Sequence, residues 1–163
     1  RVEAVRLNRG LESVDAGLFD SSSVRLVGLP ATLKNASALV RSGRASRTFA
    51  LPNGLWIAIS VHGNRQTATL VVPQDVREIV YNPIYKGLGM SCVRVLPGSS
   101  LERIGDGAFA ETDLREFVAP PSLREIGHVA FANCRRLARV ELHPGTRVDD
   151  LCFWRTGFLQ EFC

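Results

Sequence analysis

Leu101-Glu-Arg-Ile-Gly-Asp-Gly-Ala-Phe109 is followed 22 residues later by Leu123-Arg-Glu-Ile-Gly-His-Val-Ala-Phe131. The Leu, the Ile-Gly pair and the Ala-Phe pair recur at the same places in both stretches, while the positions between them differ. Neither an amphipathic helix nor an alternating strand repeats over so long a period, whereas stacked structural units do. The two stretches therefore predict a repeat protein in which each unit buries its apolar side against the next.

Further copies extend the repeat in both directions along the chain. Leu11-Glu-Ser-Val-Asp-Ala-Gly-Leu-Phe19 follows the same pattern, and Val148-Asp-Asp-Leu-Cys-Phe153 repeats its second half. Val72-Pro-Gln-Asp-Val-Arg-Glu-Ile79 aligns with Ala119-Pro-Pro-Ser-Leu-Arg-Glu-Ile126. Written as one template, the unit is L-x-x-V-x-L-P-x-x-L-x-x-I-G-x-x-A-F-x-x-C-x-x.

Each slot of this template has a physical interpretation. The first three apolar positions form a short strand that faces a core, the Pro begins a turn, and the Ile and the Ala-Phe pair line the opposite wall. Gly105 and Gly127 indicate either a positive φ or a close approach of two backbones. Cys134 lies in the Cys slot and Cys152 replaces Ala130, so both are predicted to be small buried apolar side chains.

The motif I-G-x-x-A-F-x-x-C, in units of this length, resembles the BspA-like leucine-rich repeat family. The resemblance is strong over residues 101–163, good over 1–33, fair over 67–100 and absent between about 41 and 66. It implies a leucine-rich-repeat solenoid, with a parallel β-sheet on the concave face and irregular or short helical segments on the convex face. Members of the family act mostly in adhesion and protein recognition, often at microbial cell surfaces.

Residues 41–66 break the repeat and are predicted to be an insertion. Pro52-Asn-Gly54 lies between two apolar runs, and Asn-Gly in that setting indicates a β-hairpin. A second reversal at 62–66 leads back to the solenoid, so the insertion is expected to project from the sheet or to cap it. One continuous domain results, with N-terminal leucine-rich repeats in 1–40, the loop and β-hairpin insertion in 41–66, and C-terminal repeats in 67–163.

Two further segments are predicted to be loops. Tyr85-Lys-Gly-Leu-Gly-Met90 lengthens one repeat, and it lacks the third Gly and the following helix of a phosphate-binding loop. Arg41, Arg44 and Arg47 lie in a stretch rich in Ser and Gly, which is typical of an exposed loop.

Composition and spacing argue against several functional classes. The formal net charge is +4, but the basic residues are interleaved with Glu and Asp, which disfavours nucleic acid as a partner. No apolar run is long enough to span a membrane. The four cysteines include no C-x-x-C pair and the three histidines lack ligand spacing, so no metal or other cofactor is expected. His128 and His143 are interpreted as solvated surface residues, and no catalytic constellation is found.

The strand slots predict two rows of outward-facing side chains, because the residues on either side of the middle apolar position point away from the core. In one row, Glu116, Arg139 and Glu161 are predicted to form a ladder of alternating charge, and Arg94 stands in the other row. The simpler alternative is local pairing at the surface, with each exposed pair contributing about 0.2 to 1 kcal/mol. The functional interpretation makes the ladder and Arg94 a partner-binding patch.

Trp56 on the predicted hairpin is the remaining candidate contact residue. An exposed Trp is an effective anchor for a protein partner, whereas the alternative is that Trp56 covers the core of the neighbouring repeat. The candidate partner-binding residues are therefore Trp56, Arg94, Glu116, Arg139 and Glu161.

These observations predict a non-enzymatic protein–protein interaction or scaffold module. Because the chain begins and ends within strand-like segments, we expect a structural subunit of a larger, multi-subunit assembly or a fragment of a longer repeat array. The alternative is a cell-surface adhesion or receptor-like recognition protein, which predicts a glycan on Asn35 in its Asn-Ala-Ser sequon. The pairing of Cys92 and Cys163, the identity of the protein partner and the compartment are not decided by the sequence.

Overall fold

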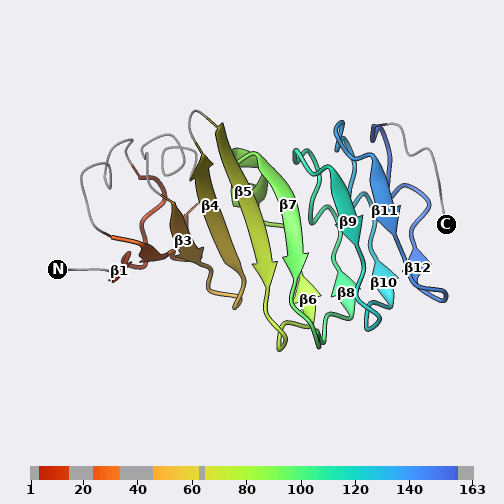
Figure 1. Cartoon of the computed structure of the whole chain (residues 1–163), viewed down its shortest axis with the longest axis horizontal. Helices are drawn as coiled ribbons and strands as arrows, with labels where there is room; N and C mark the ends of the chain where they lie inside the picture. Colours follow the sequence, from red (N-terminus) through yellow and green to blue (C-terminus); the bar gives the residue numbers. More distant parts are fainter. Residues whose placement is uncertain (1–3, 15–23, 34–45, 63–64, 158–163) are drawn as a thin grey trace.

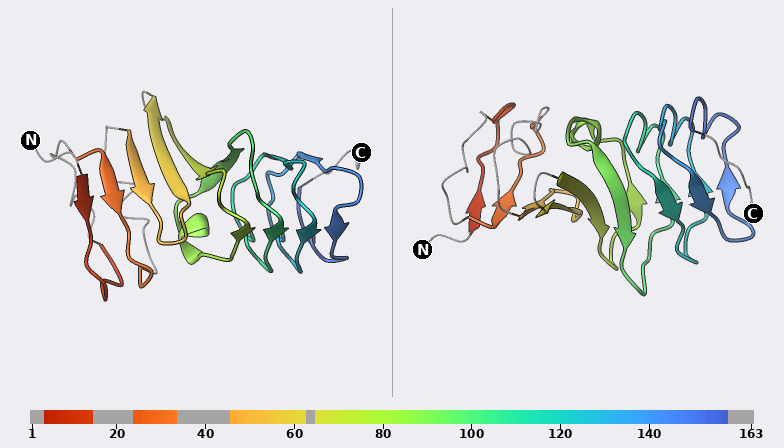
Figure 2. Two further views of the ribbon diagram at one scale, coloured as in Figure 1. Left: turned by 90° about the horizontal axis from the view of Figure 1, so that it is seen from below. Right: turned by 45° about the horizontal axis from the view of Figure 1, so that its top comes forward.

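The computed structural model describes residues 4–14, 24–33, 46–62 and 65–157. The chain winds into a solenoid whose turns lie side by side along the long axis, from β1 at one end to β12 at the other (Figure 1). Two further views show the same stacking from other directions (Figure 2). The predicted leucine-rich-repeat solenoid is confirmed.

Most strands lie on one side of the solenoid. A six-stranded main sheet has the order β1 (Ala4–Arg6), β2 (Leu26–Gly28), β3 (Arg47–Ala50), β4 (Trp56–His62), β5 (Arg65–Val72) and β7 (Met90–Val95). A two-stranded sheet of β9 (Glu116–Val118) and β11 (Arg139–Glu141) continues along the same side. We call the solvent-facing surface of these eight strands the main face.

Equal repeat lengths explain the parallel pairing, because each turn brings the same slot back to the same height. Val5 lies in register with Val27, and Phe117 lies in register with Val140. Val27 and Phe117 are fully buried, as the template requires. Pro120 begins its turn as predicted, and its carbonyl accepts a hydrogen bond from Leu123 N–H at 3.0 Å.

Aromatic rings stack from turn to turn through the core. The ring centroids of Phe109 and Phe131 are 5.3 Å apart, and those of Phe131 and Phe153 are 5.4 Å apart. Phe117 approaches from β9, on the side of the main face, and its ring centroid lies 5.3 Å from that of Phe131. Phe109, Phe117 and Phe131 are fully buried, so the predicted stacking of the Phe slots is confirmed.

The segment predicted to be a lengthening loop, residues 85–90, overlaps the short helix α2 (Pro83–Gly87). The Asn82 side chain caps it by accepting a hydrogen bond from Ile84 N–H at 3.0 Å, and Pro83 suits the first helical turn. The helix buries Tyr85, whose ring lies 6.1 Å from that of Phe109. The loop prediction is wrong here, because Tyr85 fills a Phe slot within a unit whose other residues depart from the template.

The predicted insertion is an integral part of the main sheet. β3 and β4 pair antiparallel across the turn at Pro52-Asn-Gly54, where Gly54 has a φ of 83°, and β4 pairs antiparallel with β5. The hairpin is therefore confirmed. The expectation that it projects from the sheet or caps it is wrong, since β3 pairs in parallel with β2 and β5 with β7. The domain ranges 1–40, 41–66 and 67–163 stay predictions.

A second parallel sheet lines the opposite wall, where the resemblance implied irregular or short helical segments. Its strands are β6 (Glu78–Ile79), β8 (Arg103–Ile104), β10 (Glu125–Ile126) and β12 (Arg147–Val148), in the order β12-β10-β8-β6. Each strand has two residues, of which one faces the core and the other faces solvent. Ile79, Ile104 and Ile126 are buried and lie in register.

The template glycines are explained by close backbone approach. Neither Gly105 nor Gly127 has a positive φ. A Cβ atom on Gly127 would lie 2.9 Å from the Asp106 nitrogen and 3.1 Å from the Gly105 carbonyl carbon, so a side chain has no room there. Of the two interpretations of these glycines, this one is confirmed.

Arg47 corrects the predicted Arg-rich loop. It is the first residue of β3, it is buried, and its Nε donates a hydrogen bond to the Val24 carbonyl at 3.3 Å. The exposed-loop prediction is therefore wrong for Arg47, whereas Arg41 and Arg44 lie outside the described residues.

The cysteines of the template are buried free thiols. Cys134 and Cys152 are fully buried, as predicted, while Cys92 is a half-buried free thiol on β7. Cys163 and the sequon at Asn35 lie outside the described residues.

Candidate partner-binding surface

The outward-facing side chains of the main sheet form two rows, as the template predicts. The strand register gives a first row of Ala4, Leu26, Thr48, Ala58, Thr69 and Cys92, and a second row of Arg6, Gly28, Ala50, Trp56, Val71 and Arg94. On β9 and β11, Glu116 and Arg139 occupy the first-row slots, while Val118 and Glu141 occupy the second-row slots.

Trp56 lies near the middle of the second row. Its strand neighbours in register are Ala50 and Val71, and its side chain is 48% exposed. The alternative that Trp56 covers the core of a neighbouring repeat does not hold, because the ring stands on the solvent side of the sheet. Trp56 is therefore available for contact with a partner.

Arg94 stands two strands away from Trp56 in the same row, with Val71 between them. Adjacent strands lie about 4.8 Å apart, so the Cα atoms of Trp56 and Arg94 are separated by roughly 10 Å. Arg94 is exposed, and it makes no ion pair or side-chain hydrogen bond with any of the described residues. The sequence predicted Trp56 and Arg94 as two separate candidate contact residues. The register of β4, β5 and β7 places both on the same surface.

Arg139 stands at the centre of a small charge cluster on β9 and β11. It forms an ion pair with Glu141 on its own strand, and its Nη1 lies 4.0 Å from Glu116 Oε2 on the next strand. All three side chains are about half exposed, so each pair contributes about 0.2 to 1 kcal/mol. The cross-strand rung from Glu116 to Arg139 is present, while Glu161 lies outside the described residues.

A second charge ladder crosses the opposite wall and was missed in the sequence. Glu78, Arg103, Glu125 and Arg147 lie in register on β6, β8, β10 and β12. Arg103 Nε lies 3.6 Å from Glu78 Oε1, and Arg147 Nη2 lies 3.1 Å from Glu125 Oε2. The signal was visible, since the residue before each core Ile or Val alternates between Glu and Arg. Opposite charges therefore neutralise each other along this sheet.

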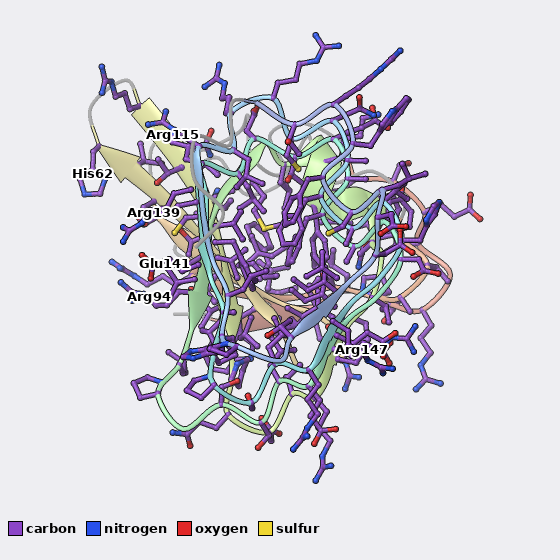
Figure 3. All side chains as sticks on the ribbon, turned by 90° about the vertical axis from the view of Figure 1, so that its right-hand side faces the viewer. His62, Arg94, Arg115, Arg139, Glu141 and Arg147 are labelled. Atoms are coloured by element: carbon purple, nitrogen blue, oxygen red, sulfur yellow. The ribbon has the colours of Figure 1, made fainter. Side chains whose placement is uncertain are left out.

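The two walls of the solenoid thus differ in charge pairing, because within the described residues the ladder on the opposite wall is paired while the main face carries unpaired arginines. His62, Arg94, Arg115, Arg139 and Glu141 lie on the main face, and Arg147 lies on the opposite side (Figure 3). Arg94 and Arg115 have no ion-pair partner among the residues that the structure describes. An acidic group of a partner could approach the main face without displacing an existing pair.

His128 is exposed, as predicted, and it also connects neighbouring repeats. Its backbone N–H donates to Asp106 Oδ1 at 2.9 Å, and its ring Nδ1 lies 2.9 Å from Asp149 Oδ1. Asp149 also accepts a hydrogen bond from Leu151 N–H, and this bond together with His128 lowers the pKa of its carboxyl group. These contacts hold three successive turns together.

Two kinds of feature were not found in the described residues. They contain no group of three or more His, Cys, Asp or Glu side chains placed to hold a metal ion. Nor do they include a helix with the length and apolar character needed to cross a membrane.

Parallel strands stacked from turn to turn, with the rings of Tyr85, Phe109, Phe131 and Phe153 in four successive turns, are typical of a leucine-rich-repeat solenoid. Residues 91–162 match the family model of the BspA type Leucine rich repeat region, which is described with 6 copies. This match confirms the resemblance found in the sequence. The match begins within β7 and therefore includes Arg94, Glu116 and Arg139.

Two solved structures are similar to this chain. One is the pneumococcal vaccine antigen PcpA, with 18% identity and a TM-score of 0.38 over 65% of this chain and 40% of that one. The other is a leucine-rich repeat protein from Bacteroides ovatus ATCC 8483, with 18% identity and a TM-score of 0.40 over 85% of this chain and 33% of that one. The chain thus spans two fifths or less of these proteins. No curated protein matches it.

Proposed function

We propose that this chain is a non-enzymatic interaction or scaffold module that holds a protein partner on its main face. The observation that carries the proposal is the placement of Trp56, Val71 and Arg94 side by side in the second row. Trp and Arg are the side chains that most often dominate the binding energy of protein interfaces, and both are accessible here. Glu116, Arg139 and Glu161 belong to the same proposed patch as its charged margin.

The role that we favour is a structural subunit or scaffold within a larger assembly. A parallel solenoid presents a long, rigid row of side chains, so binding costs little conformational entropy on this side of the interface. A protein partner fits this face better than nucleic acid does, because Glu116 and Glu141 would repel a phosphate backbone that approached Arg139.

Surface adhesion or receptor-like recognition is the alternative, and the BspA-type family match supports it. The two roles predict different properties of the full-length protein. Adhesion predicts a secretion signal upstream of Arg1 and a glycan on Asn35, whereas a scaffold subunit predicts stable co-purification with other chains. Mass spectrometry of the protein purified from its own cells measures both properties.

Paired variants test whether the main face is the binding surface. Trp56→Ala and Arg94→Glu remove the proposed anchors, while Trp154→Ala and Arg124→Glu serve as matched controls away from the main sheet. Trp154 is 47% exposed, nearly the same as Trp56, and Arg124 is also exposed and without an ion pair among the described residues.

We expect the proteins captured by the wild-type chain to be depleted at least ten-fold by Trp56→Ala with Arg94→Glu, and to be retained by the control pair. Isotope-labelled affinity capture followed by mass spectrometry measures the ratio. Circular dichroism confirms that every variant is folded. If both pairs retain the same partners, the main face is not the binding surface and the proposal fails.

A further inference from the structure

The main face is split between β7 and β9. β7 pairs with β5, and β9 pairs with β11, but the two strands do not form a ladder with each other. One backbone hydrogen bond joins them within the described part of the chain, from Arg115 N–H to the Ser91 carbonyl at 3.4 Å. The strands are held at this end and are free to separate toward the other.

A groove of about 410 Å³ occupies the separated end. One wall comes from residues 92–99 of β7 and the turn after it, and the other comes from residues 118–121, which include Val118 and two prolines. Both walls consist mainly of apolar atoms, with Val95, Leu96 and Val118 as their larger side chains.

The groove exposes positions that are buried elsewhere in the solenoid. Val93 and Val95 occupy core slots of the strand template, and their register partners on β5 are Leu70 and Val72. Leu70 and Val72 are fully buried, whereas Val93 and Val95 remain half-buried. Because exposed apolar surface costs free energy in proportion to its area, covering this floor would favour binding.

A single cation stands at the margin of the groove. Arg94 is the charged residue among those that line it, and it has no ion pair within the described residues. On β9 and β11, the acidic side chains of Glu116 and Glu141 already contact Arg139. The unmatched charge at the groove is therefore positive, and a carboxylate would complement it.

We propose that the groove between β7 and β9 binds an extended acidic segment of a protein partner. One apolar side chain of the segment enters between Val95 and Val118, and a neighbouring carboxylate pairs with Arg94. In an extended chain successive side chains point to opposite sides, so a residue in the floor leaves its neighbours at the level of Arg94. This inference rests on the proposed function and names the chemistry of the partner.

Nucleic acid does not fit the same observations. Phosphate tracking requires several cations along a path, while the groove lining supplies Arg94 together with an apolar floor. Stacking of bases would need aromatic side chains, and the groove lining contains none. A peptide with an apolar side chain uses both the floor and the charge.

Selection from a random dodecapeptide display library tests the proposal on the full chain. We expect wild-type protein to enrich peptides in which a large apolar residue is flanked by Asp or Glu. Val118→Arg fills the groove and should weaken the enriched peptides at least ten-fold, whereas Val80→Arg, at a residue of similar exposure on another wall, should leave them unchanged. Selection on Arg94→Glu should shift the enriched flanking residues to Lys or Arg.

Cys92 gives an independent readout, because it is half-buried in the lining of the groove while Cys134 and Cys152 are buried. In a Cys163→Ser background, an enriched peptide should slow the modification of Cys92 by a thiol reagent at least five-fold.

Three outcomes overturn the inference. They are enrichment of basic peptides by the wild-type chain, equal binding to Val118→Arg and wild type, and absence of any peptide that protects Cys92.

The variants Trp56→Ala and Val118→Arg distinguish a failure of this inference from a failure of the proposed function. If Trp56→Ala removes partners and Val118→Arg does not, the main face binds proteins and the groove assignment is wrong. If neither variant changes the captured partners, both proposals fail.

Discussion

The rings of Phe109 and Phe131, which occupy the same slot in successive repeats, lie 5.3 Å apart between centroids with their planes at 30°. Phe131 also contacts the rings of Phe117 and Phe153. Pairs of this kind contribute about 0.5 to 1.5 kcal/mol beyond their burial. Four successive repeats contribute the rings of Tyr85, Phe109, Phe131 and Phe153 to a continuous stack, so the stability of each of these turns depends on its neighbours.

Phe131→Ala tests this dependence. We expect it to lower the free energy of unfolding by about 3 to 5 kcal/mol, because it removes a fully buried ring that touches three others. Val118→Ala, at an exposed position, should change it by about 0.5 kcal/mol or less. Urea unfolding followed by circular dichroism measures both. If Phe131→Ala lowers the free energy of unfolding by less than about 1 kcal/mol, the result contradicts a core shared between repeats.

The double variant with Phe109→Ala adds a test of coupling. Side chains in contact are expected to give interaction energies of about 0.5 to 3 kcal/mol in a double-mutant cycle. Strict additivity for Phe109 and Phe131 would show that the two repeats unfold independently.

Gly127→Ala should destabilise the fold, since its Cβ would lie 2.9 Å from the Asp106 nitrogen and 3.1 Å from the Gly105 carbonyl carbon. Backbone atoms of the preceding repeat cannot move aside as a flexible side chain could. Gly87→Ala is the matched control, because a Cβ there meets nothing within 4 Å and Gly87 ends helix α2. Thermal unfolding should show a clear loss for Gly127→Ala and no loss for Gly87→Ala. Equal melting temperatures would contradict the close-packing explanation.

The sequence predicted the solenoid because the slots that stack are also the slots that repeat. Spacing alone identifies the core positions Ile104, Phe109, Ile126 and Phe131. The parallel register of the strands follows from the equal lengths of the repeats. The two outward rows could be written down for the same reason.

Features that depend on one unit alone could not be predicted in this way. Tyr85 fills a Phe slot through helix α2, which the other repeats do not contain within the described residues, so the template had no place for it. Arg47 looks like part of a charged loop, yet its position at the start of β3 buries it against the Val24 carbonyl. The groove beside Val118 arises from the separation of two strands, which no single strand pattern encodes.

The same reasoning explains what the sequence missed at the candidate surface. Trp56 lies in the stretch 41–66 that breaks the repeat, 38 positions before Arg94, so template spacing could not relate the two residues. Their common row depends on the antiparallel register of β4, which is set by the turn at Asn53-Gly54.

Tyr85→Phe should leave the stability unchanged or raise it slightly. Burial raises the pKa of Tyr85 to about 12, an effect that the Asn53 side chain offsets only in part. The hydroxyl oxygen is buried and makes no hydrogen bond of standard geometry, so its removal forfeits little and relieves a desolvation cost of about 1 to 3 kcal/mol. Tyr85→Ala, which also removes the ring, should cost about 3 to 5 kcal/mol. A marked destabilisation by Tyr85→Phe in urea unfolding would instead indicate a real hydroxyl partner.

Stability should fall as the pH rises from 7.5 to 9.5, and Cys152 should account for part of the loss. Burial raises the pKa of the Cys152 thiol to about 12, while a thiol in the unfolded chain titrates near about 8.5. Below pH ~8.5 both states hold the proton, so the contribution is fully present. Above that value only the unfolded state ionises, and stability is lost progressively until the pH reaches about 12.

Cys152→Ala isolates this contribution, because Ala108 and Ala130 occupy the same slot in the preceding repeats and Ala is therefore compatible with the site. Burial also raises the pKa of Cys134, so the variant should remove only part of the pH dependence, about 1 kcal/mol at pH ~9.5. The window lies below the ordinary pKa values of Tyr and Lys, which keeps Tyr85 and Lys86 out of the measurement. Urea unfolding of both proteins at the two pH values gives the comparison. Identical losses for the wild type and Cys152→Ala would mean that the Cys152 thiol ionises as readily in the folded chain as in the unfolded one.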